Sequence, residues 1–226
     1  MKSIDQFTGF TEETFRFFNG LRENNCKPWF DEHKLIYEEE VLRPMRAFAL
    51  ALTPAMYAID PRMNLNPSKI VSRIYRDIRF SPDKTPYKTN MWIMFQRIVN
   101  QWENFPGFYI EIGADGYQYG MGLYLAKKNT MDSYRSKVEY EQEHFRSITT
   151  DLTGKHGFYP EGELYKRPIA NRLPDYFQPW IQRKSIYLFK HHPIGKELFD
   201  EGFTTLIARE FSSMQPFYEF RADVCD

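Results

Sequence analysis

Cysteine is scarce in this chain, and its two copies form no recognisable pattern. Cys26 and Cys225 stand far apart among 226 residues, without a Cys-x-x-Cys pair, so we expect neither a disulfide framework nor a structural zinc site. The first residues also lack the apolar run of a secretory signal. The cytoplasm, a reducing compartment, is therefore the expected location.

Long hydrophobic runs and an excess of one charge are missing as well. The longest apolar stretch, 47–59, contains Thr53 and Pro54 and is shorter than the roughly 20 residues that cross a bilayer. Thirty basic residues balance thirty acidic ones, so no overall field attracts nucleic acid or an anionic membrane. We expect no membrane association and rank nucleic acid last among candidate partners. The sequence gives no oligomeric state.

The signature loops of several enzyme classes are absent too. The chain contains no Gly-x-Gly-x-x-Gly, no Gly-x-x-x-x-Gly-Lys-Ser/Thr, no Gly-x-Ser-x-Gly and no His-Glu-x-x-His, which leaves nucleotide-fold, serine-hydrolase and zincin interpretations without support. His191 and His192 are adjacent, and neighbours on a strand face opposite ways, so we interpret them as surface residues. We expect no cofactor and no metal site.

The hydrophobic period changes along the chain. Apolar residues recur every three or four positions in a helix that Thr11 caps and Asn24-Asn25 ends, and again from Pro28 to Leu52, where Pro44 should kink or split the helix. Turn-forming residues predict a connector over 54–67. The period then becomes two, which predicts strands at 70–80, 91–95, 108–113 and 117–125, the last two joined by an Asp115-Gly116 turn. Later patterns predict a long helix over 131–156, a short strand over 185–191 and a helix over 201–220.

These elements define an α+β fold. Short connections favour a predominantly antiparallel sheet, covered by the amino-terminal helices and by the long helix after the fourth strand. We expect one domain over 1–226, helical over 1–54, with the sheet at about 68–126 and a helical and irregular part over 130–226.

Basic residues concentrate in one segment although the net charge is zero. Residues 69–88 hold six basic side chains against two acidic ones. Arginine forks match phosphate or carboxylate oxygens, lysines add point charges, and an aromatic ring can stack on a planar ligand. The segment therefore predicts an anion receptor, and its ligand-binding residues would be Arg73, Arg79, Lys84, Tyr87 and Lys88.

Arg76 does not fit the receptor pattern. On a strand it projects opposite to Arg73 and Arg79, onto the apolar face, so we interpret it as a structural group. An alternative holds for the whole block: the arginines pair internally with Asp77, Asp83 and the acid-rich flanking segments, as a salt-bridge network that stabilises the fold.

Four segments together resemble a known family. They are Phe7-Thr8-Gly9-Phe10, Lys27-Pro28-Trp29-Phe30-Asp31-Glu32-His33-Lys34-Leu35-Ile36-Tyr37, Arg73-Ile74-Tyr75-Arg76-Asp77-Ile78-Arg79-Phe80-Ser81-Pro82-Asp83-Lys84-Thr85-Pro86-Tyr87-Lys88 and Pro106-Gly107-Phe108-Tyr109. In this order they look like the conserved hypothetical family called domain of unknown function 2461. The resemblance covers nearly the whole chain and weakens after about residue 155. It implies that the arginine block is a family signature, and it carries over no activity, ligand or catalytic residue.

Three side chains are candidates for acid–base chemistry. His33 lies one helical turn from Trp29 and Tyr37, in an aromatic neighbourhood that can shift an imidazole pKa; the simpler interpretation is a hydrogen-bonded core histidine beside the structural residues Trp29 and Phe30. Asp77 and Asp83 could also serve, although their basic neighbours make charge partners of them. The catalytic residues, if any exist, stay unassigned.

The residues leave three functional hypotheses open. The first is a binding module for a small anionic ligand, which can carry phosphate, at the arginine-rich segment 73–88. The second is an enzyme acting on such a ligand, with His33 or Asp77 as the acid or base and the arginines stabilising developing negative charge. The third is a structural or protein-interaction module in which the arginine block is an internal salt-bridge network.

Overall fold

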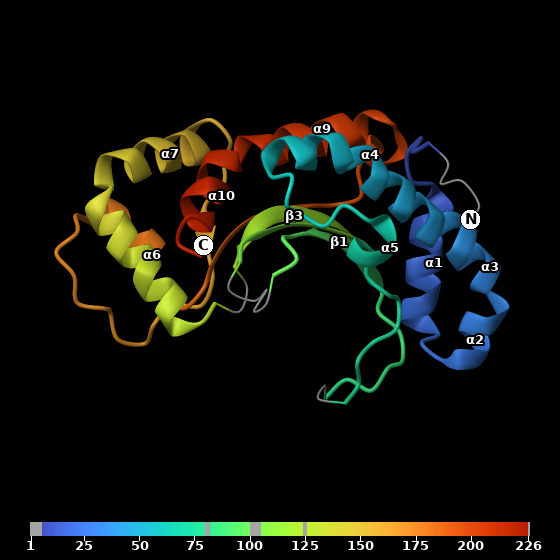
Figure 1. The fold of residues 1–226 in the computed structure, drawn as a ribbon. Coiled ribbons are helices and arrows are strands. Elements are labelled where there is room, and N and C mark those ends of the chain that lie inside the picture. The colour runs from blue at the N-terminus through green and yellow to red at the C-terminus, as the bar shows by residue number, and fades with distance from the viewer. Residues whose placement is uncertain (1–5, 80–81, 100–104, 124–125, 226) are drawn as a thin grey trace. The chain divides into compact units, whose positions relative to one another are not determined.

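The computed structural model describes residues 6–79, 82–99, 105–123 and 126–225. Its helices and strands alternate in groups along the chain (Figure 1). The helical elements are α1 Glu12–Glu23, α2 Lys27–Glu32, α3 Lys34–Ile36, the π-helix η1 Tyr37–Leu42, α4 Arg43–Ile59, α5 Pro67–Ile70, α6 Lys128–Tyr140, α7 Gln142–Gly154, η3 Asp175–Phe177, α8 Gln178–Ile181, η4 Lys196–Phe199, α9 Gly202–Ser213 and α10 Gln215–Ala222. The strands are β1 Asn90–Phe95, β2 Gly107–Gly113, β3 Gly116–Leu123, β4 Pro160–Glu161 and β5 Ile186–His192.

The five strands form an antiparallel sheet in the order β1-β2-β3-β5-β4, which confirms the predicted α+β class. At its end, Pro160 pairs with Leu188 and Glu161 with Tyr187. The Asp115-Gly116 turn joins β2 to β3 as expected, and Gly116 takes a positive φ of 145°, a conformation that favours glycine. None of the helices in the described ranges is both long and apolar enough to cross a membrane.

Contacts divide the chain into two compact units. The first holds the described residues up to Phe95, with Tyr109–Tyr119 and His191–Ala208. Its core is aromatic: Phe48 of α4 stacks on Phe203 at a centroid distance of 5.1 Å and meets Phe10 edge-on at 5.8 Å. Thr11 caps α1 with a reciprocal pair of side-chain bonds to Thr14, as its sequence position predicted.

The second unit holds Gln96–Phe108, Gly120–Lys190 and the described residues from Arg209. Rings from α7, α8 and α10 pack around Phe145, which contacts Trp180 edge-on at 5.6 Å and Phe220 at 5.1 Å. Arg221 is also fully buried here, with its guanidinium carbon 4.0 Å from the ring centroid of Tyr134. Burial lowers the pKa of Arg221, and the ring face partly replaces the water that the cation has lost.

The strand predicted over 70–80 is wrong. Within its described part, Ile70 ends the short helix α5, and the residues that follow make only the isolated bridges Val71–Ile93 and Tyr75–Tyr87. Val71 and Tyr75 are four positions apart, whereas their partners Ile93 and Tyr87 are six positions apart. The two segments therefore cannot keep one register. Pro86 has no N–H to give to a ladder. Phe80, the last residue of that prediction, lies outside the described residues.

The helix predicted from Pro28 to Leu52 is in fact several elements. The backbone passes from α2 and α3 into the π-helix, where the Arg43 N–H reaches back to the Glu38 carbonyl, and then into α4. The connector predicted over 54–67 starts later than expected, because α4 continues to Ile59 with Pro54 inside it, and residues 60–66 then link α4 to α5. Buried residues on α4, including Met56 and Ile59, keep the helix packed beyond the proline.

The helix predicted over 131–156 is two helices. The backbone leaves helical geometry at Glu141, with φ −113° and ψ 44°, and α7 restarts at Gln142. No proline or glycine marks this bend, so the sequence pattern did not reveal it. Gly157 has the left-handed φ of 65° expected of it. The helix expected over 201–220 is likewise divided, into α9 and α10.

Candidate functional site

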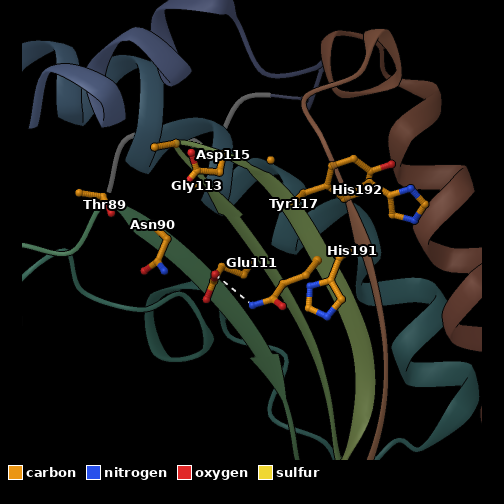
Figure 2. A pocket seen from close by; sticks show the side chains of 11 residues that line it. Thr89, Asn90, Glu111, Gly113, Asp115, Tyr117, His191 and His192 are labelled. Atoms are coloured by element: carbon orange, nitrogen blue, oxygen red, sulfur yellow. Dashed lines mark hydrogen bonds between the residues drawn. The ribbon is translucent and has the colours of Figure 1, made fainter. Parts of the chain in front are cut away.

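An open cavity of about 310 Å³ lies beside the β2–β3 hairpin in the first unit (Figure 2). It is bordered by the start of β1, by both hairpin strands and by the end of β5. Its polar lining includes Thr89, Asn90, Glu111, Asp115, Gln118 and His191.

Strand alternation selects the side chains that reach this cavity. On β2, Ile110 and Ile112 are buried while Glu111 between them is half-buried, and on β3 Gln118 is half-buried between the buried Tyr117 and Tyr119. Successive strand residues point to opposite faces of a sheet. The polar residues therefore share the face opposite to the hydrophobic core.

Glu111 is held by two neighbours. The Tyr109 hydroxyl donates a hydrogen bond to Oε2 of Glu111, and Nε2 of Gln118 donates to Oε1 at 3.1 Å; Figure 2 draws the second bond. Both carboxylate oxygens accept a bond, so the side chain is fixed in one orientation on the cavity wall.

The two adjacent histidines lie on opposite sides of β5. His191 is exposed and lies on the side of Gln118, whereas His192 is beside Tyr117 (Figure 2). His192 stacks on Tyr117 at 4.9 Å and on Tyr119 at 5.5 Å. Among the described residues, no three metal-binding side chains come together, so the two histidines are not part of such a group there.

Lys88, in the first unit, has unusual surroundings for a positively charged side chain. Its Nζ lies 3.6 Å from the ring centroid of Trp92, and within the described ranges the ammonium has no hydrogen bond or ion pair. Burial, together with the charges of Arg73 and Arg76, lowers the pKa of Lys88 to about 8, against the opposing influence of Glu111. The charges of Arg73, Arg76 and Glu111 therefore influence the protonation of Lys88.

The two arginines near Lys88 retain donors. Arg73 is exposed and forms no hydrogen bond or ion pair with the described residues. Arg76 is half-buried: Nη1 lies 3.2 Å from Asp83 Oδ2, and Nη2 donates to the Tyr87 carbonyl at 3.3 Å. Its Nε is buried and has no partner in the described part of the chain. Arg76, expected to be structural, thus both anchors the loop and keeps one unsatisfied donor.

The other charged candidates are engaged locally. Arg79 donates from Nε and Nη2 to both oxygens of Asp77, and these bonds lower the pKa of Asp77 to about 2. Asp83 accepts from the Thr85 N–H and hydroxyl, which lowers its pKa. Lys84 donates to the Ile78 carbonyl at 2.8 Å. The two aspartates are thus held as carboxylates that accept hydrogen bonds.

Tyr87 anchors the loop through a buried side chain. Its side chain is only 4% exposed and stacks on Phe30 at 4.3 Å, while Tyr75, 5.5 Å from it, is 58% exposed. Tyr75 and Trp92 therefore offer more ring surface to a ligand than Tyr87 does.

His33 has a different environment. Its ring stacks on Trp29 at 3.9 Å, and Nδ1 lies 2.8 Å from the Trp29 carbonyl oxygen. Since a carbonyl oxygen accepts, Nδ1 carries the proton in this contact. Trp29 in turn packs closely on Gly20, and Phe30 is buried. The contacts of His33 are those of a residue that holds α2 together.

Asn25 connects the amino-terminal helices to this loop, which leads to a first prediction. Its side chain donates to the Tyr87 carbonyl and accepts from the Tyr87 N–H, both at 3.0 Å. We expect Asn25→Ala to lower the free energy of unfolding by about 2 kcal/mol, because both backbone groups lose a partner. Urea denaturation measures this. Asn24→Ala removes a single bond, to the Gly20 carbonyl, and should cost less; equal losses would contradict the assigned role.

Sequence reasoning missed the sheet residues of this region. Trp92, Glu111 and Gln118 were not candidates, and His191 was interpreted as a surface residue. Glu111 and Gln118 are remote from the arginine block in sequence, whereas Trp92 stands four residues after Lys88 in a segment predicted only as a strand. One signal was present: Glu111 stands between two isoleucines in a predicted strand, where a charged residue must face away from the core.

A family model described as a conserved hypothetical protein, DUF2461, matches residues 13–220. No curated protein matches the chain. The family was expected from the arginine block and its companion segments, and the match extends well past residue 155, where the resemblance weakens. The chain belongs to the DUF2461 family.

Proposed function

We propose that the chain is a binding module for a small anionic ligand that carries a phosphate or carboxylate group. Arg73, Arg76 and Lys88 would form its centre, with Arg79 and Lys84 at the edge. The proposed ligand would lie against these cations, beside the Trp92 ring that Lys88 covers.

The single observation that carries this proposal is the state of Lys88. A half-buried ammonium without a hydrogen bond or ion pair among the described residues loses hydration, and in return it gains the ring of Trp92 and the charge of Glu111. Nearby Arg73 and Arg76 add repulsion. An anion would relieve both costs, since it supplies acceptors and offsets the repulsion between the neighbouring positive charges.

The salt-bridge alternative explains part of the block. Arg79 with Asp77, and Arg76 with Asp83, are ion pairs of the kind that it requires. However, it gives no ion pair to Arg73 or Lys88 among the described residues: Asp77 and Glu111 act on them through their charge alone. The binding proposal accounts for these two residues, and it uses the ion pairs as supports of the loop.

The enzyme alternative is favoured by one observation, the lowered pKa of Lys88. His33 and Asp77 are weaker choices for an acid or base, because His33 is engaged with Trp29 and Asp77 with Arg79. Any catalysis at this site would be expected to use Lys88.

Arg73→Ala tests the binding proposal. Titration calorimetry at low salt with inorganic phosphate, pyrophosphate and oxalate should find an anion whose affinity the variant weakens at least about ten-fold, with an unchanged free energy of unfolding, because charge-assisted bonds contribute about 1.5–3 kcal/mol. Arg79→Ala should weaken binding less, since Asp77 already occupies that guanidinium.

Arg16→Ala is the matched control, because Arg16 is an exposed arginine paired with Glu12 and Glu13 on α1. It should leave affinity unchanged. Wild-type protein that binds none of the three anions, or equal losses in the Arg73 and Arg16 variants, would contradict the proposal. Preference for single-stranded nucleic acid over the small anions would support the last-ranked partner instead.

We also propose a cytoplasmic location. Support comes from the free thiols Cys26 and Cys225, which an oxidising compartment would expose to modification.

A further inference from the structure

Lys88 has the surroundings of a reactive amine as well as those of an anion receptor. Three features coincide at Nζ: it lies over the Trp92 ring, the described residues give it no hydrogen-bond acceptor, and two arginines act on it electrostatically. An amine must be neutral to attack a carbonyl, and partial burial beside other cations favours the neutral form. The lysine pKa near 8 agrees with this geometry.

The neighbouring groups match the other needs of such chemistry. The guanidinium of Arg73, which has no hydrogen bond or ion pair among the described residues, can hold an anionic group while the amine reacts, and Arg76 adds its positive charge. Glu111, whose charge also acts on Lys88, is fixed by Tyr109 and Gln118. A carboxylate of this kind can relay protons during loss of water.

We propose that the Lys88 amine condenses with the carbonyl group of a small anionic aldehyde or ketone, whose carboxylate or phosphate is held by Arg73 and Arg76. This inference rests on the proposed anion site and names its substrate class. The nitrogen lone pair forms the new C–N bond while the C=O π electrons move to oxygen. Both amine hydrogens leave with that oxygen as water, and a C=N bond remains. No oxidant or reductant takes part.

Reductive trapping tests the proposal on the full wild-type chain. Glyoxylate supplies an aldehyde and a carboxylate, and cyanoborohydride delivers a hydride to the imine carbon, so that a stable secondary amine results. Peptide mass spectrometry should find Lys88 modified at least about ten-fold faster than Lys69, an exposed lysine of α5. Inorganic phosphate should slow labelling of Lys88 and leave Lys69 unaffected.

Two comparisons separate this inference from the binding proposal. Acetaldehyde carries no anionic group and should show little preference for Lys88, and Arg73→Ala should slow labelling by glyoxylate but not by acetaldehyde. If phosphate binds in calorimetry while glyoxylate labels Lys88 no faster than Lys69, the condensation is refuted and the binding site stands. If none of phosphate, pyrophosphate and oxalate binds or protects Lys88, both are refuted.

Discussion

Replacing Lys88 by methionine is expected to abolish anion binding and to stabilise the protein at neutral pH. Methionine keeps an apolar stem of similar length over Trp92 and removes the charge that burial and two arginines disfavour. After allowance for solvent screening we expect a gain of about 1 kcal/mol in the free energy of unfolding. Affinity for the anion should fall by more than about ten-fold.

The pH dependence of this gain follows from the lysine pKa. Unfolded, Lys88 holds its proton up to about pH 10.5, whereas folded it releases the proton near pH 8. Since the unfolded state binds more protons between these values, wild-type stability from this group rises with pH there. The gain in the free energy of unfolding from Lys88→Met is therefore largest below pH 8 and decreases above it.

Urea denaturation at pH 7 and pH 9.5, with phosphate calorimetry at pH 7, checks both effects. Lys69→Met is the control, because Lys69 is an exposed lysine; it should change neither affinity nor stability appreciably. A Lys88→Met protein that binds phosphate like wild type would show that this ammonium is not part of an anion site.

The largest loss of stability is expected from Gly120→Ala in the second unit. A Cβ at Gly120 would overlap the Leu188 carbonyl oxygen and the Phe189 ring of the neighbouring strand β5. Its φ is not positive, so the cost is steric and not conformational. Because the obstacle is backbone, the strands must separate locally, and we expect at least about 3 kcal/mol of destabilisation.

Gly154→Ala is a matched control in the same unit. A Cβ at Gly154, at the end of α7, would have no atom within 4 Å, and alanine favours the helix by about 0.5–1 kcal/mol over glycine. Urea denaturation should therefore show opposite signs for the two substitutions. Similar stabilities would mean that β3 and β5 are not packed as closely as described.

Much of the fold could be predicted because it is encoded locally. Thr11 caps α1, the Asp115-Gly116 pair turns the hairpin, and alternation in β2 distinguishes Ile110 from Glu111. Gly120 is a glycine within a strand, and such a glycine permits the close neighbour that β5 supplies.

The errors occur where tertiary contacts override a local pattern. Residues 71–79 alternate like a strand, but Pro86 and the unequal spacing of the two bridges prevent a continuous ladder. The bend at Glu141 carries no proline or glycine. Pro54 suggested a connector, yet the buried residues beyond it keep α4 intact.

The candidate site was predicted in part for the same reason. The local excess of positive charge indicated Arg73 and Lys88, and the short spacing between Asp77 and Arg79 allowed their ion pair. Glu111 could not be associated with the block, because it is remote from it in sequence. Trp92 is only four residues from Lys88, but the contact between them was not foreseen in a segment predicted only as a strand. The sequence also could not show that Arg76 both pairs with Asp83 and keeps a spare Nε.

The most direct test of the anion site is an NMR titration of the Lys88 side chain, with and without phosphate. The signal is assigned by its loss in Lys88→Met, and Lys69 serves as an internal reference. The account predicts a Lys88 pKa of about 8 in the free protein, raised when phosphate binds, because the anion stabilises the ammonium. A pKa near the ordinary lysine value of 10.5, unchanged by phosphate, would contradict it.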